Sequence, residues 1–215
     1  MLIREKIVRR TAKAGLRLPV DVADRLHTYF GLLRQWNRKV SLTALPVEDA
    51  GDEAIDRLLV EPILASRYLP KNDVAILDVG SGGGSPAIPM RIAAPGGSLR
   101  MVESKTRKAA FLREVIRKLE MASAEVDAVR SEELLARPSL HDAFDVVSVR
   151  AVRIERKTLT ELQSFARPGG LVFLFGTAAT PSSQLTGTGL AHFGHHELIR
   201  EWGSTLDVLQ KRASL

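Results

Sequence analysis

The chain has 215 residues, no cysteine and a formal net charge of +6, with 45% apolar and 26% charged residues. These values are typical of a globular protein with a sizeable core, and the missing cysteines exclude disulfides, thiolate zinc sites and sulfur nucleophiles. Because no apolar run is as long as a membrane span and the first residues lack the apolar centre of a signal peptide, we expect no membrane partner and a cytoplasmic location.

The first seventy residues show the periodicity of helices. After Pro19, which favours a helix start, apolar residues recur at spacings of three and four from Val22 to Trp36. A second apolar set between Ile55 and Tyr68 predicts another helix, and Pro62 inside it predicts a kink or a break. We therefore expect residues 1–70 to form a helical cap packed on a main domain, residues 71–215.

From Val74 onward, segments typical of strands alternate with segments typical of helices. The predicted strands are Val74–Val79, Ser98–Val102, Glu125–Val129, Phe144–Val149 and Leu171–Phe175. The predicted helices are Ala87–Ala94, Thr106–Met121, Glu132–Ala136 and Ile154–Ala166. A mobile loop, Thr177–Gly189, and a closing antiparallel hairpin, His192–Arg200 with Thr205–Gln210, follow them. This order predicts an α/β fold around a mostly parallel sheet.

The stretch Ile76–Pro89 carries the strongest functional signal. An apolar strand ends in Asp78, and glycines follow at alternate positions, Gly80, Gly82 and Gly84. Glycine permits positive φ and lets backbone N–H groups approach a ligand. At the end of the next strand, Glu103 is placed to accept hydrogen bonds from both hydroxyls of a ribose. The pattern predicts a site for a nucleotide-like cofactor, and its spacing resembles motif I of S-adenosylmethionine-dependent methyltransferases rather than a dinucleotide site.

Other candidate residues also follow strand ends. In an open α/β sheet ligands bind at the carboxyl ends of the strands, where Arg130 and Arg150 lie. The helix that begins at Thr106 has basic residues at its ligand-side end, Lys105, Arg107 and Lys108. The positive net charge favours a polyanionic partner, so these residues either contact phosphates or form an ordinary solvated face.

Five segments resemble one known family over residues 2–176. They are Leu32-Leu33-x-x-Trp36-Asn37 with Leu42-Thr43, the extended glycine motif Asp78–Pro89, Glu103-Ser-Lys-x-Arg107-Lys108-x-x-Phe111-Leu112, Arg130-x-Glu132, and Ser148-x-Arg150-Ala151. This series resembles the bacterial methyltransferases that modify guanine N7 in small-subunit ribosomal RNA, the glucose-inhibited division protein B family.

The resemblance implies a seven-stranded, Rossmann-like class I methyltransferase sheet with an N-terminal helical cap. It implies S-adenosylmethionine as cofactor and small-subunit ribosomal RNA or the ribosomal subunit as partner. We also expect a monomer. The implied cofactor contacts are Asp78, Gly80, Ser81, Gly82, Gly84, Glu103, Ser104, Ser131, Glu132 and Arg150. Arg150 and Arg57 are implied at the reaction centre, and the implied RNA contacts are Lys39, Lys105, Arg107 and Lys108.

The chain also departs from this family at several positions. Where members commonly have Arg-His-x-x-Asp-Ser-Leu, the chain has Arg57-Leu58-Leu59-Val60-Glu61-Pro62-Ile63, which keeps the arginine and loses the histidine, aspartate and serine. Further replacements are Ser41 for asparagine, Ser85 for a bulky apolar residue, Ala87 for glycine and Phe175 for lysine. These positions fall near the implied reaction centre.

The residues favour methylation of a ring nitrogen. Guanine N7 has a lone pair and no proton, so its methylation needs alignment more than a base, and Arg150 or Arg57 could hold the guanine or a phosphate unless each forms only a salt bridge. Carbon-5 methylation of pyrimidines ordinarily uses a cysteine, which the chain lacks. The Asp/Asn-Pro-Pro-aromatic motif of amine methylation is replaced by Ser148–Ala151.

Two alternative functions stay open at this stage. One is a diverged methyltransferase for another substrate, and the other is a binding module that keeps the cofactor fold without catalysis. We expect no metal, because the only adjacent histidines, His195 and His196, would point to opposite faces of a strand. Glu132 and Glu133 either cap a short helix or, in the case of Glu132, lie beside the adenine.

Overall fold

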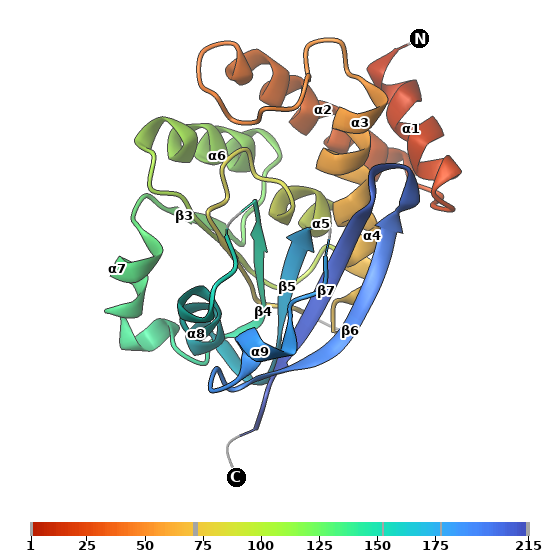
Figure 1. The fold of residues 1–215 in the computed structure, drawn as a ribbon. Helices are drawn as coiled ribbons and strands as arrows, with labels where there is room; N and C mark the ends of the chain where they lie inside the picture. The colour runs from red at the N-terminus through yellow and green to blue at the C-terminus, as the bar shows by residue number, and fades with distance from the viewer. Residues whose placement is uncertain (1, 71–72, 152, 177, 214–215) are drawn as a thin grey trace.

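A seven-stranded sheet forms the centre of the computed structural model, which describes residues 2–70, 73–151, 153–176 and 178–213 (Figure 1). Its order is β3-β2-β1-β4-β5-β7-β6. The strands are β1 Ile76–Val79, β2 Leu99–Val102, β3 Ala124–Asp127, β4 Phe144–Arg150, β5 Ala166–Gly176, β6 Leu190–Ile199 and β7 Ser204–Lys211. Neighbours pair in parallel except β7, which is antiparallel to β5 and β6. The predicted α/β class, the parallel sheet and the closing hairpin are confirmed.

Helices cover both faces of the sheet (Figure 1). The N-terminal ones are α1 Ile3–Lys13, α2 Val20–Asn37, α3 Asp52–Ile55 and α4 Glu61–Ala65, and they share one apolar core with α5 Ala87–Ala93 and α6 Thr106–Lys118. A second core lies on the other face under α7 Ser131–Leu135 and α8 Arg156–Phe165. The domain boundary at residue 70 stays a prediction. Within the described ranges, no helix combines the length and the apolar character that a membrane crossing requires.

Two predicted element boundaries are wrong for identifiable reasons. The first strand begins at Ile76 rather than Val74, because the N–H of Ala75 donates to the carboxylate of Asp145 at 2.7 Å instead of to the sheet. Ala166 begins β5, although its apolar spacing placed it at the end of the preceding helix. Ala166 pairs with Phe144 across a shift in register between β4 and β5, so β5 begins before its apolar run, which starts at Leu171.

Pro62 does not break the helix that contains it. Helical turns continue from α3 into α4 through a π-helical segment, η1 Asp56–Val60. Since proline has no N–H, the carbonyl of Leu58 cannot receive its usual helical hydrogen bond, and the N–H of Glu61 donates to Asp56, five residues earlier. The carbonyls of Arg57 and Leu58 are therefore free to accept hydrogen bonds from the main domain.

The segment predicted as a mobile loop contains a short helix, α9 Ser182–Leu185. Thr180 and Thr188 are buried, and the N–H of Thr180 donates to the carboxylate of Asp207 at 2.7 Å. Thr177 lies outside the described residues. The segment is thus hydrogen-bonded to β7 through Asp207, and its mobility stays a prediction.

Candidate active site

Two adjoining cavities open where the strand order reverses between β1 and β4, the position at which open α/β sheets bind ligands. The larger, of about 580 Å³, is lined by Arg150 and is here named the Arg150 cavity. The smaller, of about 460 Å³, is lined by Ser131 and is named the Ser131 cavity. Gly80, Glu103 and Lys108 line both of them. One extended ligand could therefore occupy the two together.

The glycine loop after β1 has the backbone that the sequence predicts. Its φ angles are +73° at Gly80, +52° at Gly82 and +85° at Gly84. The expectation that its N–H groups face a ligand is wrong for four residues. Gly80 and Ser81 donate to the carbonyl of Val102, Gly84 donates to the carbonyl of Ser81, and Gly82 donates to Glu103. The end of β2 and Glu103 after it accept three of these donors and the loop itself accepts the fourth, so the loop borders the Arg150 cavity with its other atoms.

Glu103 links the glycine loop to the start of α6. Its side chain is largely buried, and its carboxylate accepts the N–H groups of Gly82 at 2.9 Å and Lys105 at 2.7 Å. A carboxylate has about four lone-pair positions, so two hydrogen bonds leave acceptor capacity beside the cavities. Glu103 can therefore accept hydroxyl groups of a ligand in a position that the backbone has fixed.

Two of the predicted cofactor residues, Asp78 and Gly84, line neither cavity. Asp78 precedes the glycine loop and is buried. The hydroxyl of Ser148 donates to Oδ1 of Asp78 at 2.6 Å, whereas Oδ2 is buried without a hydrogen-bond partner. Burial raises the pKa of Asp78 to about 6, although hydrogen bonds from Ser148 and Ser81 and the charge of Arg150 oppose the shift. This carboxylate therefore ties β1 to β4, and the hydroxyl of Ser81 donates to the backbone carbonyl of Asp78 at 3.0 Å.

The Ser131 cavity combines apolar walls with a polar rim. The walls come from four strands or strand ends and from α8, and they are Val79, Val102, Val129, Val149, Leu162 and Phe165. Besides Gly80 and Glu103, three more of the predicted cofactor residues line this cavity, namely Ser104, Ser131 and Glu132. The apolar wall residues carried no signal in the sequence, because only the fold collects them. A flat, mostly apolar ring with polar edges suits such a space.

Arg150, at the end of β4, is held on three sides. Its Nη2 donates to Oε2 of Glu61 at 2.9 Å, its Nη1 donates to the carbonyl of Arg57, and its guanidinium carbon lies 4.7 Å from the centre of the Phe175 ring. Burial lowers the pKa of Arg150 and raises the pKa of Glu61, and in each case the opposite charge of the partner counteracts the shift. The pair forms a largely buried ion pair at the cavity wall.

This arrangement accounts for three departures from the family pattern. Glu61 supplies the carboxylate where the resemblance expects aspartate. Phe175 replaces a lysine with a ring on which the Arg150 guanidinium can stack. Ser85 donates its hydroxyl to the carbonyl of Leu58 at 2.9 Å, the same carbonyl that Pro62 leaves free. Arg57 lies 3.8 Å from Glu61 and 3.5 Å from Glu53, so it forms salt bridges while also lining the Arg150 cavity.

The N-terminal helices form the roof of the Arg150 cavity. The buried hydroxyl of Tyr29 donates to the carbonyl of Gly83 at 2.6 Å, and a Cβ on Gly83 would lie 3.0 Å from Leu33. Oδ1 of Asn37 accepts the N–H groups of Leu42 at 2.9 Å and Thr43 at 3.1 Å. Because residues 42–45 line the cavity, Asn37 fixes the shape of its roof.

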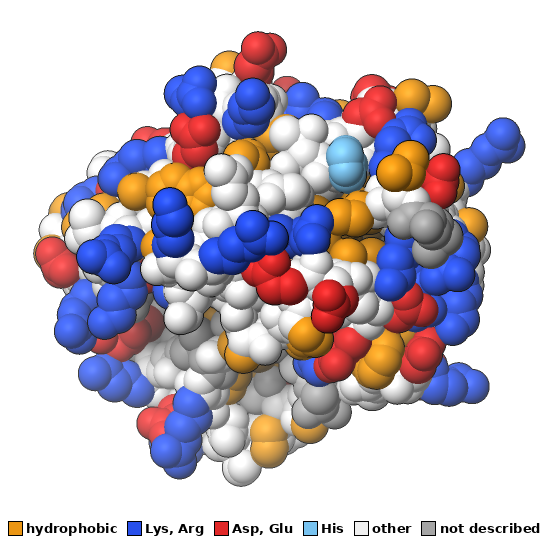
Figure 2. Space-filling model, turned by 90° about the horizontal axis from the view of Figure 1, so that it is seen from above, with side chains coloured by type: hydrophobic (Ala, Val, Ile, Leu, Met, Phe, Trp, Pro, Cys, Tyr) orange, Lys and Arg blue, Asp and Glu red, His pale blue; other side chains and the backbone are white. Residues whose placement is uncertain are grey.

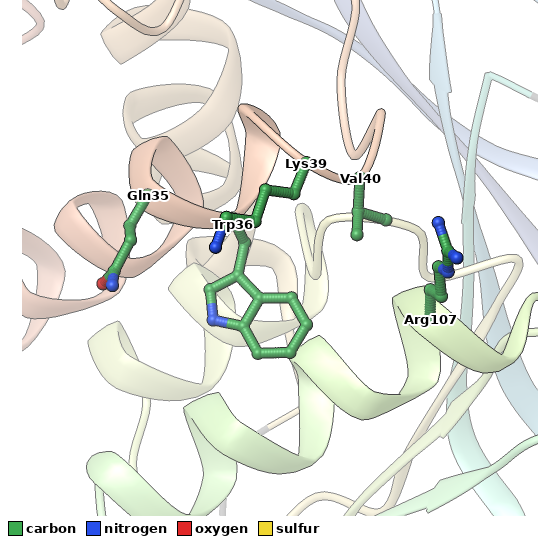
Figure 3. Close-up of a pocket in the computed structure, with 5 residues that line it drawn as sticks. All are labelled: Gln35, Trp36, Lys39, Val40 and Arg107. Carbon is green, nitrogen blue, oxygen red and sulfur yellow. The ribbon is translucent and has the colours of Figure 1, made fainter.

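The four predicted RNA contacts do not gather at one point. Lys105 lines the Ser131 cavity and Lys108 lines both cavities. Lys39 and Arg107 line a third cavity, of about 540 Å³, together with Trp36 (Figure 3). Figure 2 shows the molecule from above, where Lys and Arg side chains gather with acidic side chains between them.

Comparison with known proteins gives a consistent result. A family model described as rRNA small subunit methyltransferase G matches residues 23–186. A protein of that name from Polynucleobacter asymbioticus is 36% identical over 162 residues, which cover 74% of this chain and 71% of the relative. Another, from Syntrophotalea carbinolica, is 35% identical over 156 residues, covering 73% and 68%.

Solved structures resemble the chain in fold. An S-adenosylmethionine-dependent methyltransferase from Aquifex aeolicus has a TM-score of 0.55 and 15% identity, covering 76% of this chain and 95% of that one. Precorrin-6y C5,15-methyltransferase from Geobacter metallireducens has a TM-score of 0.52 and 15% identity, covering 71% and 87%. At these identities the likeness shows a class I methyltransferase fold and nothing finer.

Proposed function

The chain belongs to the rRNA small subunit methyltransferase G family, and we propose that it transfers the methyl group of S-adenosylmethionine to N7 of a guanine in small-subunit ribosomal RNA. The observation that carries the proposal is the pair of joined cavities at the strand reversal, with Glu103 between them. Such an enzyme would work in the cytoplasm, as a monomer, on the ribosomal RNA or on the subunit that contains it.

The residues present fit this cofactor. The apolar walls of the Ser131 cavity suit adenine, with Ser104, Ser131 and Glu132 at its polar rim. Glu103 suits the ribose, because its carboxylate is fixed by two backbone N–H groups and keeps acceptor capacity. Gly80, Ser81 and Gly82 border the space left for the methionine part. When bound, the cofactor supplies a methyl group on a positively charged sulfur.

Orientation is the main contribution that we propose for the protein. Guanine N7 needs no base, so holding the guanine in line with the methyl group can supply most of the rate enhancement. Arg150 is oriented by Glu61 and the Arg57 carbonyl, and its Nε is buried without a partner among the described residues. We assign Arg150 to holding the guanine or an adjacent phosphate, with Arg57 beside it. Residues 42–45 cover one side of this space.

Four cations support an RNA substrate. Lys39, Lys105, Arg107 and Lys108 form no salt bridge with any described acid. Some cations on other surfaces do, as in the pairs Arg4–Asp24, Arg100–Asp127 and Arg117–Glu114, whereas others, such as Lys118, do not, so it is the position beside the cavities that distinguishes the four. A lysine or arginine without an acidic partner can bind a phosphate without first breaking an ion pair. The cations that border the cavities are therefore suited to the RNA backbone.

A methyl-acceptor assay tests the proposal. Small ribosomal subunits, and RNA extracted from them, would be prepared from a bacterial strain that lacks this methylation and incubated with labelled S-adenosylmethionine. We expect label at N7 of a guanine, no transfer by Arg150→Ala, and an unchanged rate for Lys118→Ala at the far end of α6. If neither the subunits nor the extracted RNA carried a labelled guanine, the proposal would be refuted.

A further inference from the structure

The third cavity has no part in the proposed methyl transfer. It has a volume of about 540 Å³ and is lined by Gln35, Trp36, Lys39, Val40 and Arg107. Figure 3 shows it between the C-terminal end of α2, the segment that follows, and the first turns of α6. We name it the Trp36 cavity. No acidic residue lines it, so it differs in charge from the Arg150 cavity, whose wall contains Glu61 and Glu103.

Trp36 gives this cavity a fixed aromatic wall. The indole packs on the buried ring of Phe111, with 5.7 Å between the ring centres and 58° between the planes. It is only partly buried, so part of its surface faces the cavity together with Val40. An aromatic ring held in place by a second ring can pack against any of the four nucleobases, because every base has an aromatic face.

Lys39 and Arg107 add positive charge beside the aromatic wall. Both side chains are exposed, and neither forms a salt bridge with an acid in the described part of the chain. An aromatic surface flanked by unpaired cations, with no acid in the lining, matches a base with its phosphates. The same cations would repel a basic peptide. A nucleotide is therefore the ligand that the lining favours.

The position of the Trp36 cavity relates it to the candidate active site. Arg107 lines the Trp36 cavity and the next residue, Lys108, lines the Arg150 cavity. Likewise, Val40 lines the first and Leu42 lines the second. The two cavities thus lie on either side of the same short segments of chain. A single RNA strand could occupy both with different nucleotides.

We propose that the Trp36 cavity binds a second, unpaired nucleotide of the substrate RNA. Its base packs against Trp36, and its phosphates contact Lys39 and Arg107. An unpaired nucleotide is specified because a base within a duplex is already stacked on its neighbours and cannot present its face to a side chain. This inference rests on the proposed function, since it takes RNA to be the substrate.

Tryptophan fluorescence tests the base contact directly, because the chain has only two tryptophans, Trp36 and Trp202. In a Trp202→Phe variant, a short single-stranded RNA should quench the emission of Trp36 and protect it from acrylamide. Inorganic polyphosphate, which has phosphates but no bases, should do neither. In a Trp36→Phe variant, which keeps only Trp202, the same RNA should leave the emission unchanged.

Two outcomes would overturn the inference. One is an unchanged Trp36 emission at RNA concentrations where fluorescence anisotropy of a labelled RNA shows full binding. The other is equal quenching by RNA and polyphosphate. Neither measurement depends on methyl transfer, so a failed methyl-acceptor assay would count against the proposed function and these outcomes against the cavity alone.

Charge variants provide a second, independent readout. Lys39→Ala and Arg107→Ala should each weaken RNA binding roughly fivefold or more and reduce its salt dependence. Lys118→Ala removes a charge from the same helix away from the cavity and should have little effect. Binding of S-adenosylhomocysteine should be the same in all three, which would show an intact cofactor site. Equal RNA affinities for the three variants would contradict the role of the cavity.

Discussion

The two cavities of the candidate active site are built in different ways. Around Glu103, the backbone of the glycine loop and of the start of α6 holds the carboxylate. Around Arg150, side chains from distant segments hold one another, with Glu61 and Phe175 in contact with the guanidinium. The first arrangement depends on backbone N–H groups at neighbouring strand ends, and the second depends on a buried ion pair. The second should therefore be more sensitive to single substitutions.

The largest expected effect is on the Arg150 side. Arg150→Ala leaves the buried charge of Glu61 without its hydrogen-bonded partner and with only the Nε of Arg57, 3.8 Å away, so we expect a loss of about 3–5 kcal/mol in the free energy of unfolding. The double variant Arg150→Met with Glu61→Leu removes both charges and should recover most of that stability while remaining inactive. Chemical denaturation measures both. Arg153→Ala, an exposed member of a surface pair with Glu155, is the control and should change little.

The proposed difference between the Arg150 side and the Glu103 side would be contradicted if Arg150→Ala unfolded at the same denaturant concentration as the wild type. That result would mean that the ion pair contributes no more than a surface pair. The Arg150 side would then be no more sensitive than the Glu103 side.

The buried carboxyl of Asp78 in β1 should make the free energy of unfolding depend on pH. Its pKa is 3.8 in an ordinary environment and about 6 in the folded protein, so the folded state binds the proton more tightly. The contribution of Asp78 to stability therefore falls by about 2 kcal/mol as the pH rises from about 4 to about 6, out of about 3 kcal/mol between pH values well below 4 and well above 6. Asp78→Asn cannot ionise and should lack this fall. Unfolding free energies of both proteins across that range measure the difference.

An exposed acid provides the matched control for Asp78. Asp49→Asn should leave the pH dependence as it is in the wild type, because Asp49 is exposed to solvent. If Asp78→Asn and the wild type lost stability in parallel over the same range, Asp78 would not be the group that titrates.

On the Glu103 side, the expected effect is on ligand affinity. Glu103→Ala should weaken binding of S-adenosylhomocysteine by about 1–3 kcal/mol, because hydrogen bonds to a charged acceptor are lost. Calorimetry with this ligand and with its 2′-deoxy analogue separates a ribose contact from a distorted loop. Removing the hydroxyl should weaken binding to the wild type and have little further effect in Glu103→Ala. If the losses of affinity caused by Glu103→Ala and by removal of the hydroxyl were fully additive, Glu103 would not contact the ribose.

The smallest expected effect concerns Ser85. Ser85→Ala removes the hydrogen bond to the Leu58 carbonyl, which Pro62 cannot replace, and should lower the free energy of unfolding by about 1 kcal/mol. In Ser85→Ala with Pro62→Ala, the restored N–H at position 62 can serve that carbonyl, so the cost should be smaller. If Ser85→Ala lowered the free energy of unfolding equally with Pro62 and with Ala at position 62, the role of Ser85 would not depend on the carbonyl that Pro62 leaves free.

The sequence could predict what depends on neighbouring residues. The alternation of apolar segments predicted the α/β class and most strands, since periodicity determines which residues can be buried together. The glycines at positions 80, 82 and 84 predicted the positive φ angles. Glu103 was found from its position after β2. These features need few residues from elsewhere in the chain.

Long-range contacts decided the remainder. Tyr29, Glu61 and Phe175 carry no local signal for a site, and they meet the glycine loop or Arg150 only after the N-terminal helices pack on the sheet. The sequence predicted N–H groups of the loop facing a ligand, but it could not show that the end of β2 accepts them. The local sequence thus determined the elements and the position of Glu103. Tertiary packing decided which atoms are free, because a donor or charge is free only if no distant partner reaches it.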